Sequence, residues 1–176
     1  MGKTITAVNI KKLWYGDTSK ITAQVTGATL AGILPLLTEV KNVHQDTWTL
    51  EEAEASKTNY KNQLSGLTYR SDKEMGDVSV NFTLGEYEYQ TKAELMGGTA
   101  TETSWERASG KVSIEKTLVG LTEDGQYIVI PRADISARES TTDKAVGLPV
   151  VGTELEPTVA GVAPEYWFDA SVVVAG

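Results

Sequence analysis

The sequence predicts a mainly β fold, a β-sandwich or barrel with one short α-helix. Apolar and polar residues alternate from Val78 to Leu84, which is the period of a strand with one buried face. Four consecutive apolar residues, 127–130, are typical of a strand buried on both faces. The apolar run LAGILPLL is interrupted by Gly32 and Pro35, which disfavours a long helix. We expect about six to nine short strands around one core, in a single domain spanning 1–176.

Residues 1–20 are expected to form an extended N-terminal arm that ends in a turn at Gly16-Asp17. The arm carries two adjacent large aromatic residues, Trp14 and Tyr15. A terminal segment is usually poorly ordered unless something holds it down. These side chains therefore pack either on their own domain, which is the favoured alternative, or on a neighbouring subunit. The interrupted apolar run at 30–37 is expected to be an irregular segment that crosses beneath the core.

A second extended element is expected at 39–55, where Val43, Thr47 and Thr49 favour a strand. Trp48 would share one face of this strand with the polar side chain of His44, because residues four apart lie on the same face. A mixed face of this kind suits the edge of a sheet or an interface.

The segment 55–76 is predicted to be a long loop, because its large residues are scattered among polar ones without a sustained period. Insertions of more than about 12–15 residues without regular structure are uncommon in compact domains and are usually functional or disordered. The aromatic side chains favour an ordered contact with a partner. Together with the two tryptophans above, this segment supplies the candidate subunit contacts, which are Trp14, Trp48, Tyr60, Leu64 and Tyr69.

One short helix is expected after the strand at 78–84. Thr91 and Glu94 have the spacing of a capping box, in which two backbone donors at a helix start are satisfied reciprocally. Gly97 and Gly98 should end the helix within about two turns, because glycine adopts the left-handed conformation without steric cost. The predicted helix, 91–96, contains Thr91, Glu94 and Leu95.

Further strands are expected in the second half of the chain. Pro131 should end one of them, because proline has no backbone N–H to donate to a ladder. The parity of the apolar residues changes at Val150-Val151, beside Pro149, which predicts a bulge or a step in register. The predicted strands are 111–118, 126–130, 132–138, 146–155 and a closing strand at 171–175.

Composition restricts the function. A net charge of −8 and a pI near 4.7 argue against a surface that grips phosphates. Cysteine is absent, which excludes disulfides, thiolate metal sites and cysteine nucleophiles. No stretch reaches the ~18 apolar residues of a membrane span and the first residues do not lead into a signal-peptide core, so we expect synthesis in a cytoplasm.

The two ends of the sequence have opposite charge. Residues 1–20 carry four lysines and one aspartate, whereas residues 145–176 carry four acidic residues and no lysine or arginine. If they are also spatial ends of the subunit, such ends would steer head-to-tail stacking, although salt screens exposed pairs. The alternative is that the ends of the sequence are not ends of the folded subunit.

The sequence offers no catalytic or ligand-binding constellation. His44, the only histidine, lies near Asp46, but no nucleophile motif accompanies the pair. Glu51, Glu52 and Glu54 lack the pattern of a calcium loop and are expected to form a solvated face. We therefore expect no enzyme, no cofactor and no metal.

Four stretches together resemble the major tail tube proteins of long-tailed bacteriophages. The match is an order of parts over roughly 38–158: a strand, a long loop, an alternating strand with a short helix closed by Gly-Gly, and late strands containing a Gly-Leu-x-Val sequence. The stretches are DTWTLEEAE, TNYKNQLSGLTYR, GDVSVNFTLGEYEYQTKAELMGG and GQYIVIPRADISARESTTDKAVGLPVVGTELEP. The type VI secretion tube is a related architecture.

The resemblance implies a structural subunit that assembles into hexameric rings, which stack into a hollow tube for DNA delivery in the virion tail. The helix at 91–96 would pack outside the sheet, and the loop at 55–75 would reach an adjacent subunit or ring. Partners would be further copies and other phage tail proteins, while DNA would pass without specific binding because a carboxylate-lined lumen repels phosphates. Pro149 departs from the pattern, since it removes a ladder donor from a late strand.

An alternative from another class remains open. A monomeric β-sandwich module would bind a carbohydrate or a protein through an aromatic platform of Trp48, Tyr60, Tyr69 and Trp105. Assembly into rings at high protein concentration distinguishes the tube subunit from this module.

Overall fold

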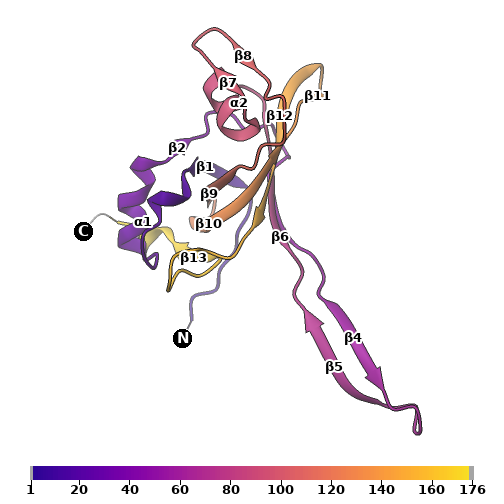
Figure 1. Cartoon of the computed structure of the whole chain (residues 1–176). Coiled ribbons are helices and arrows are strands. Elements are labelled where there is room, and N and C mark those ends of the chain that lie inside the picture. The colour runs from indigo at the N-terminus through magenta and orange to yellow at the C-terminus, as the bar shows by residue number, and fades with distance from the viewer. Residues whose placement is uncertain (1, 175–176) are drawn as a thin grey trace.

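A computed structural model describes residues 2–174 and confirms a mainly β fold with short helices (Figure 1). Its largest element is a nine-stranded sheet with the antiparallel order β2-β1-β9-β10-β12-β6-β3, to which β11 is added on β12 and β13 on β10. Its strands are β1 (Ile10–Gly16), β2 (Thr38–Glu39), β3 (Thr49–Glu52), β6 (Val78–Leu84), β9 (Glu115–Thr122), β10 (Gln126–Ala137), β11 (Ser140–Thr142), β12 (Ala145–Glu154) and β13 (Tyr166–Asp169).

Two small sheets and several short helices complete the chain. The sheets pair β4 (Ser56–Lys61) with β5 (Thr68–Glu74), and β7 (Thr99–Ala100) with β8 (Trp105–Glu106). The helices are α1 (Gly27–Ile33), α2 (Tyr89–Met96), and the 3₁₀ turns η1 (Thr18–Lys20), η2 (Leu34–Leu36) and η3 (Ala170–Val172).

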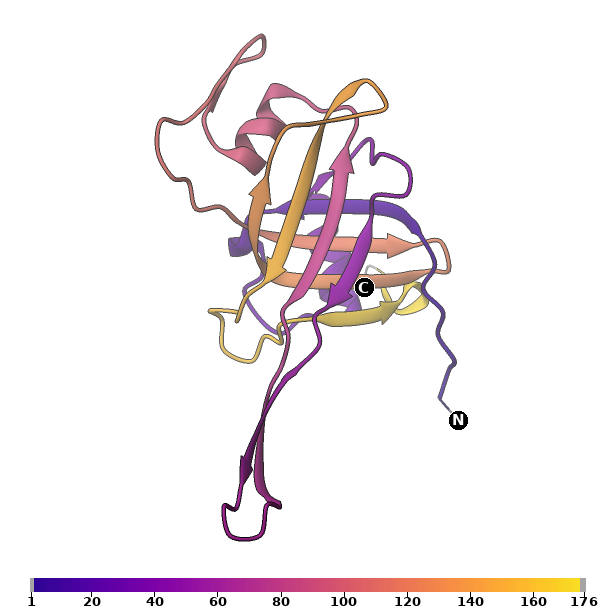
Figure 2. The same ribbon diagram turned by 90° about the vertical axis from the view of Figure 1, so that its right-hand side faces the viewer.

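Strand β10 divides the large sheet into two layers that cross at a steep angle (Figure 2). Its first half pairs with β9 and β13, and its second half pairs with β12. Between the halves the register shifts from Ile130 to Ala133. We name the β2-β1-β9-β10-β13 part the back layer and the β10-β12-β6-β3 part the front layer. The expectation that Pro131 ends a strand is wrong: it lies at this irregularity, where a missing donor is tolerated.

The main core fills the space between the two layers. Alternate residues of β6 point into it, as the sequence pattern predicts, and Phe82 and Leu84 are almost completely buried. The back layer contributes the opposite wall. The core cluster comprises Leu13, Tyr15, Val80, Phe82, Leu84, Leu95, Leu118, Ile130, Ala133, Ile135, Leu148 and Val150.

A second, smaller core lies on the other face of the back layer, where α1 covers it. Residues 30–37 were expected to be irregular, but α1 and η2 occupy most of this segment. Thr26 caps α1: its hydroxyl accepts from the Thr29 backbone N–H, and the Thr29 hydroxyl accepts from the Thr26 backbone N–H. Pro35 is in the first turn of η2, where its missing N–H costs little. The fold therefore contains a second α-helix, α1, that was not predicted from the sequence.

The predicted N-terminal arm is partly a core strand. Trp14 and Tyr15 belong to β1 and are buried on opposite faces of the back layer, so the own-domain alternative is correct and Trp14 is not available as a subunit contact. Residues 2–9 are exposed and belong to no helix or strand. Lys3 forms an ion pair with Asp169, and the Val8 backbone N–H donates to the Asp124 carboxylate at 2.9 Å. The oppositely charged ends of the chain thus meet within one subunit.

Helix α2 closes one end of the space between the layers. It begins two residues earlier than expected, with Glu88 as the N-cap, and the predicted Thr91–Glu94 capping box does not form. Glu94 instead accepts a hydrogen bond of 2.7 Å from the Tyr15 hydroxyl, and Leu95 is fully buried in the main core. The end of the helix is as predicted, because Gly97 follows Met96 with a φ of 79°.

Three other expectations change in the second half of the chain. The strand expected at 111–118 lies at Glu115–Thr122, and β12 keeps one register across Pro149 and Val150-Val151, without the predicted bulge. Val151 simply faces outward. The predicted closing strand at 171–175 is wrong where the structure describes it: the last strand is β13, and η3 follows. Residue 175 lies outside the described part.

Candidate functional site

The segment predicted as a long loop is a β-hairpin that projects from the domain (Figure 1). Strand β4 continues the direction of β3, and β5 leads into β6, so the hairpin extends two strands of the front layer beyond the body. At about 3.3 Å per residue, the seven residues of β5 span roughly 20–25 Å. The expectation of a segment without regular structure is therefore wrong: the segment is an ordered hairpin that projects from the body.

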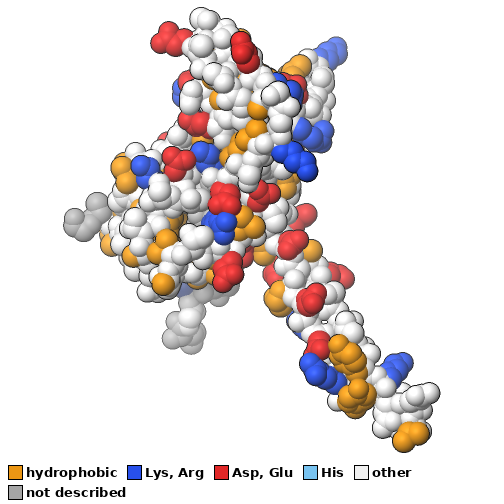
Figure 3. All heavy atoms as spheres, viewed as in Figure 1, with side chains coloured by type: hydrophobic (Ala, Val, Ile, Leu, Met, Phe, Trp, Pro, Cys, Tyr) orange, Lys and Arg blue, Asp and Glu red, His pale blue; other side chains and the backbone are white. Residues whose placement is uncertain are grey.

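The hairpin is exposed on both faces. Every residue of β4 is exposed, and in β5 only Asp72 is partly covered. Large apolar side chains nevertheless lie on it (Figure 3). Leu64, at the tip, is 97% exposed. An isolated two-stranded hairpin is at best marginally stable in water, and exposed apolar patches mark interaction sites. The large apolar side chains that the hairpin exposes are Tyr60, Leu64, Leu67, Tyr69 and, at its base, Met75.

Local hydrogen bonds give the tip a defined shape. The Asn62 side-chain carbonyl accepts from the Leu64 backbone N–H at 2.8 Å, and the Asn62 backbone N–H donates to the Leu67 carbonyl at 2.8 Å. Gly66 adopts a φ of 73°, which favours glycine, and donates to the Asn62 carbonyl. The tip thus presents Leu64 on an ordered turn, which lowers the entropy lost when it binds a partner.

The hairpin is basic although the chain is acidic. Residues 56–74 contain four basic and two acidic residues, which leaves 12 basic and 22 acidic residues in the rest of the chain. Lys57 and Lys73 lie directly opposite each other in the ladder, an arrangement that destabilises a hairpin. Arg70 is held by Asp72 at 3.0 Å and lies over the Tyr60 ring at 5.5 Å. An acidic partner surface would reduce the electrostatic repulsion between Lys57 and Lys73.

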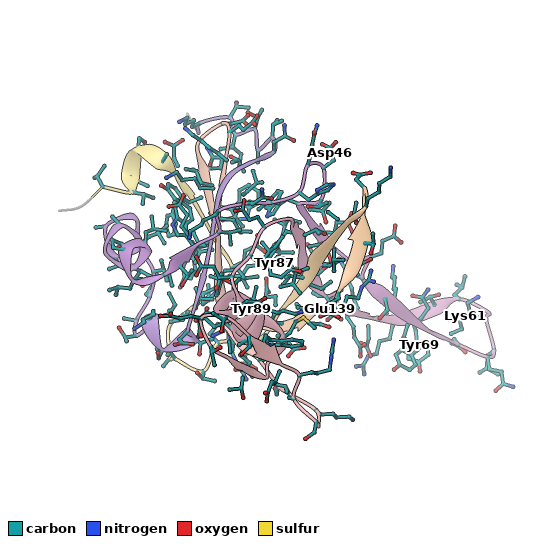
Figure 4. All side chains as sticks on the ribbon, turned by 90° about the horizontal axis from the view of Figure 1, so that it is seen from above. Asp46, Lys61, Tyr69, Tyr87, Tyr89 and Glu139 are labelled. Atoms are coloured by element: carbon teal, nitrogen blue, oxygen red, sulfur yellow. The ribbon has the colours of Figure 1, made fainter. Side chains whose placement is uncertain are left out.

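Three of the five predicted contact residues come together on the hairpin. Tyr60, Leu64 and Tyr69 all lie there, and Figure 4 shows Tyr69 beside Lys61 on this projection. Trp48 is half-buried against the main core and lines a groove of about 390 Å³ with residues of β1. Its indole N–H is buried and has no hydrogen-bond partner among the described residues. The predicted contacts did not include Leu67 or the lysines of the hairpin. Leu67 could have been found as a large apolar residue among polar neighbours, and the lysines as a local excess of basic residues in an acidic chain.

The aromatic platform of the alternative binding module is not assembled. Trp48 and Trp105 lie on the body, while Tyr60 and Tyr69 lie on the hairpin. Cations already cover the Trp105 ring, with Lys92 at 4.0 Å and Arg107 at 5.3 Å from its centroid. The four aromatic side chains therefore offer no common surface to one ligand.

The residues considered for chemistry are also dispersed. His44 contacts Asp143 in the turn between β11 and β12, at 3.1 Å, and not Asp46. Glu51 and Glu52 lie on the exposed part of β3. Within 2–174, no group of three or more His, Asp or Glu side chains is arranged to hold a metal ion, and no helix is long and apolar enough to cross a bilayer. No protein-family model matches the chain, and no curated protein is significantly similar to it.

A destabilised carboxyl group lies where the hairpin joins the body. Burial raises the pKa of Glu154, and the neighbouring carboxylates Glu165 and Glu52 raise it further. One of its carboxyl oxygens is buried without a hydrogen-bond partner in the described residues. The charged form of Glu154 is thus disfavoured in the folded protein.

We expect Glu154→Gln to stabilise the monomer at pH 7. A raised pKa means that folding favours the protonated form, so the free energy of unfolding falls as pH rises through the raised pKa. The gain should be less than about 1 kcal/mol because solvent screens a partly exposed group, and it should vanish near pH ~3, where both states are protonated. Urea unfolding at the two pH values measures it. The control is Glu106→Gln, at an exposed site where the carboxylate forms no ion pair with any residue in 2–174. An equal gain there, or a gain that persists at pH ~3, would contradict the assignment.

Proposed function

We propose that this chain is a self-assembling structural subunit of a phage-type tail tube, in which rings stack through the β4–β5 hairpin. One observation supports this proposal above all: an ordered hairpin exposes Leu64, Leu67 and Tyr69 beyond its own domain. These side chains gain burial only against another molecule, at about 25 cal/mol per Å² of apolar surface. The hairpin also follows the strand direction of the front layer, so contacts through it repeat along one axis.

The outer face of the front layer is suited to line the lumen of such a tube. Short polar side chains occupy it on β6, namely Ser79, Asn81 and Thr83, and their neighbours Thr49 and Thr153 are similar. These polar groups present no row of cations to phosphates, and an exposed apolar side chain among them, Val151, offers phosphates no attraction, so DNA would slide past them. Glu51, opposite Ser79, adds an exposed carboxylate to this face, but hydroxyl and amide groups predominate, so the face is less acidic than a carboxylate-lined lumen requires.

The ends of the front layer support lateral contacts within a ring. Strand β3 terminates the strand order, and its outer edge pairs with no strand in residues 2–174. An open edge of this kind invites pairing with another chain. Together with the axial hairpin contact, it gives two different heterologous contacts, one that closes a ring and one that extends a stack. Other tail proteins would meet the ends of the stack.

The proposed function is tested by negative-stain microscopy of the purified chain over a concentration series, with light-scattering mass on the same samples. We expect rings or tubes of uniform diameter to appear as concentration rises, and to depend on salt because the hairpin and the body have opposite charge. A clean monomer at every concentration and salt would overturn the proposal and favour the binding-module alternative.

A further inference from the structure

A groove of about 840 Å³ lies between α2 and the β7–β8 hairpin. These two elements lie at the end of the molecule opposite the β4–β5 hairpin (Figure 1). Tyr87, Tyr89 and Gln90 form one wall, and Thr101 with Glu102 forms the other. The opposite placement means that one molecule cannot insert its own hairpin into this groove. Figure 4 shows the same separation, with Tyr87 and Tyr89 on the body and Lys61 and Tyr69 on the projection.

The groove is both aromatic and acidic. Tyr89 is 47% exposed. Glu86 and Glu102, beside and within the groove, form no ion pair with any described residue. The one basic residue in its lining, Lys92, is neutralised by Glu139 at 2.5 Å. The surface therefore presents unpaired carboxylates next to an apolar ring.

The walls of the groove are held in place. The Tyr87 hydroxyl donates to the Val146 carbonyl at 3.0 Å, and the Trp105 indole N–H donates to the Gly97 carbonyl at 2.9 Å. Across the β7–β8 turn, the Thr101 backbone N–H donates to the Ser104 carbonyl at 2.9 Å. A groove with fixed walls loses little conformational entropy when it is filled.

The tip of the β4–β5 hairpin has the complementary chemistry. Lys61 adjoins the tip turn that carries Leu64, and Tyr69 lies next to the ladder partner of Lys61. Lys57 and Lys73 face each other nearer the base of the hairpin, and none of the three lysines forms an ion pair among the described residues. Basic and apolar groups on an ordered turn match carboxylates and a tyrosine ring in an open groove. The unpaired Lys61 beside the tip, with Lys57 and Lys73 further along the hairpin, thus corresponds to two unpaired glutamates at the other end of the molecule.

We infer that the hairpin tip of one copy docks in the α2/β7–β8 groove of the next copy. This inference rests on the proposed function, and it names the surface that receives the hairpin. Because donor and acceptor lie at opposite ends, the contact is heterologous: each bound copy leaves one hairpin and one groove free. Further copies can therefore add to either end of the stack, and this contact does not fix its length.

Disulfide trapping tests this inference cleanly because the chain contains no cysteine. Leu64→Cys is mixed with Thr101→Cys at a concentration where assembly occurs, oxidised, and examined by intact-mass spectrometry. The control pairs Leu64→Cys with Leu36→Cys, an exposed residue of η2 away from the groove. We expect the heterodimer of the Leu64→Cys and Thr101→Cys chains to exceed the control heterodimer by about tenfold or more, since docking raises the local thiol concentration.

Two results would overturn the inference while leaving the proposed function intact. Tubes that form without a cross-link between the Leu64→Cys and Thr101→Cys chains would place the hairpin elsewhere on its neighbour. A dominant homodimer of the Leu64→Cys chain would show that hairpin tips meet each other. Monomers at every concentration, with no cross-link of any kind, would overturn the proposed function itself and the docking with it.

Discussion

Val80→Asp is expected to prevent folding of the subunit. Val80 is 4% exposed and points from β6 into the main core between the two layers. It faces Leu50 and Gly152 on the neighbouring strands, and no cation lies in the core cluster to pair with a new carboxylate. Burying an unpaired charge costs several kcal/mol, which approaches the total stability of about 5–15 kcal/mol of a typical domain. Circular dichroism and one-dimensional NMR of the variant would show loss of the native signals.

The matched control is Val151→Asp. Val151 belongs to the adjacent strand β12, opposite Asn81, and its side chain is exposed on the outer face of the front layer. The same chemical change there should cost less than about 1 kcal/mol, because the new carboxylate stays in water. A folded Val80→Asp protein with the melting behaviour of Val151→Asp would mean that the inner face of β6 is not the core.

The parts of the fold that the sequence predicts well are those where local pattern and tertiary packing agree. On β6, alternation identifies the buried face because one side meets the core and the other meets solvent. The end of α2 at Met96 follows from Gly97 alone. The start of α2 does not follow from local pattern: Glu94 has a tertiary partner, Tyr15, which competes with the capping interaction.

Other elements depend on partners that are remote in sequence. Trp14 and Tyr15 are adjacent and both buried, which occurs only if the strand is covered on both faces, and that requires α1. Thr26 and Thr29 form the capping box at the start of α1, which is a local helix signal. Gly32 and Pro35 disfavour a helix, so the sequence pattern as a whole did not predict α1. Val151 breaks the inward pattern of β12 without changing its register, because its face is directed outward.

The sequence predicted which residues of the candidate site are exposed for contact, namely Tyr60, Leu64 and Tyr69, but not that they lie on a β-hairpin. The strands of the β4–β5 hairpin have no buried face, so they lack the alternation by which strands are usually recognised. Its turn does carry local signals, at Asn62 and Gly66. The receiving groove could not be predicted at all, since α2, β7 and β8 form it only after the chain has folded.

Removing the hairpin is expected to abolish assembly and preserve the monomer. In this variant residues 57–73 are replaced by Asn-Gly, which joins Ser56 to Glu74, a pair that already faces across the ladder. The hairpin contributes no residue to either core cluster, so the melting temperature should change by less than about 4 °C. Burial of Leu64, Leu67 and Tyr69 at a contact is worth about 1.5–3 kcal/mol per fully buried side chain. Their loss should raise the concentration needed for assembly by more than about 100-fold.

Two controls are needed. The first tests whether assembly requires the apolar side chains of the hairpin or only its length, and the second tests whether altering any turn impairs assembly. A full-length variant with serine at Leu64, Leu67 and Tyr69 keeps the ladder but removes the apolar contacts, and it too should remain monomeric at concentrations where the unaltered chain assembles. The second control, Asp143→Asn with Lys144→Gly, changes the β11–β12 turn, where both residues have positive φ. Asn-Gly is favoured in such a turn, so this variant should fold and assemble normally. If the hairpin-deletion variant does not fold, the hairpin is part of the core. If it assembles at the same concentration as the unaltered chain, the axial contact is formed by another surface.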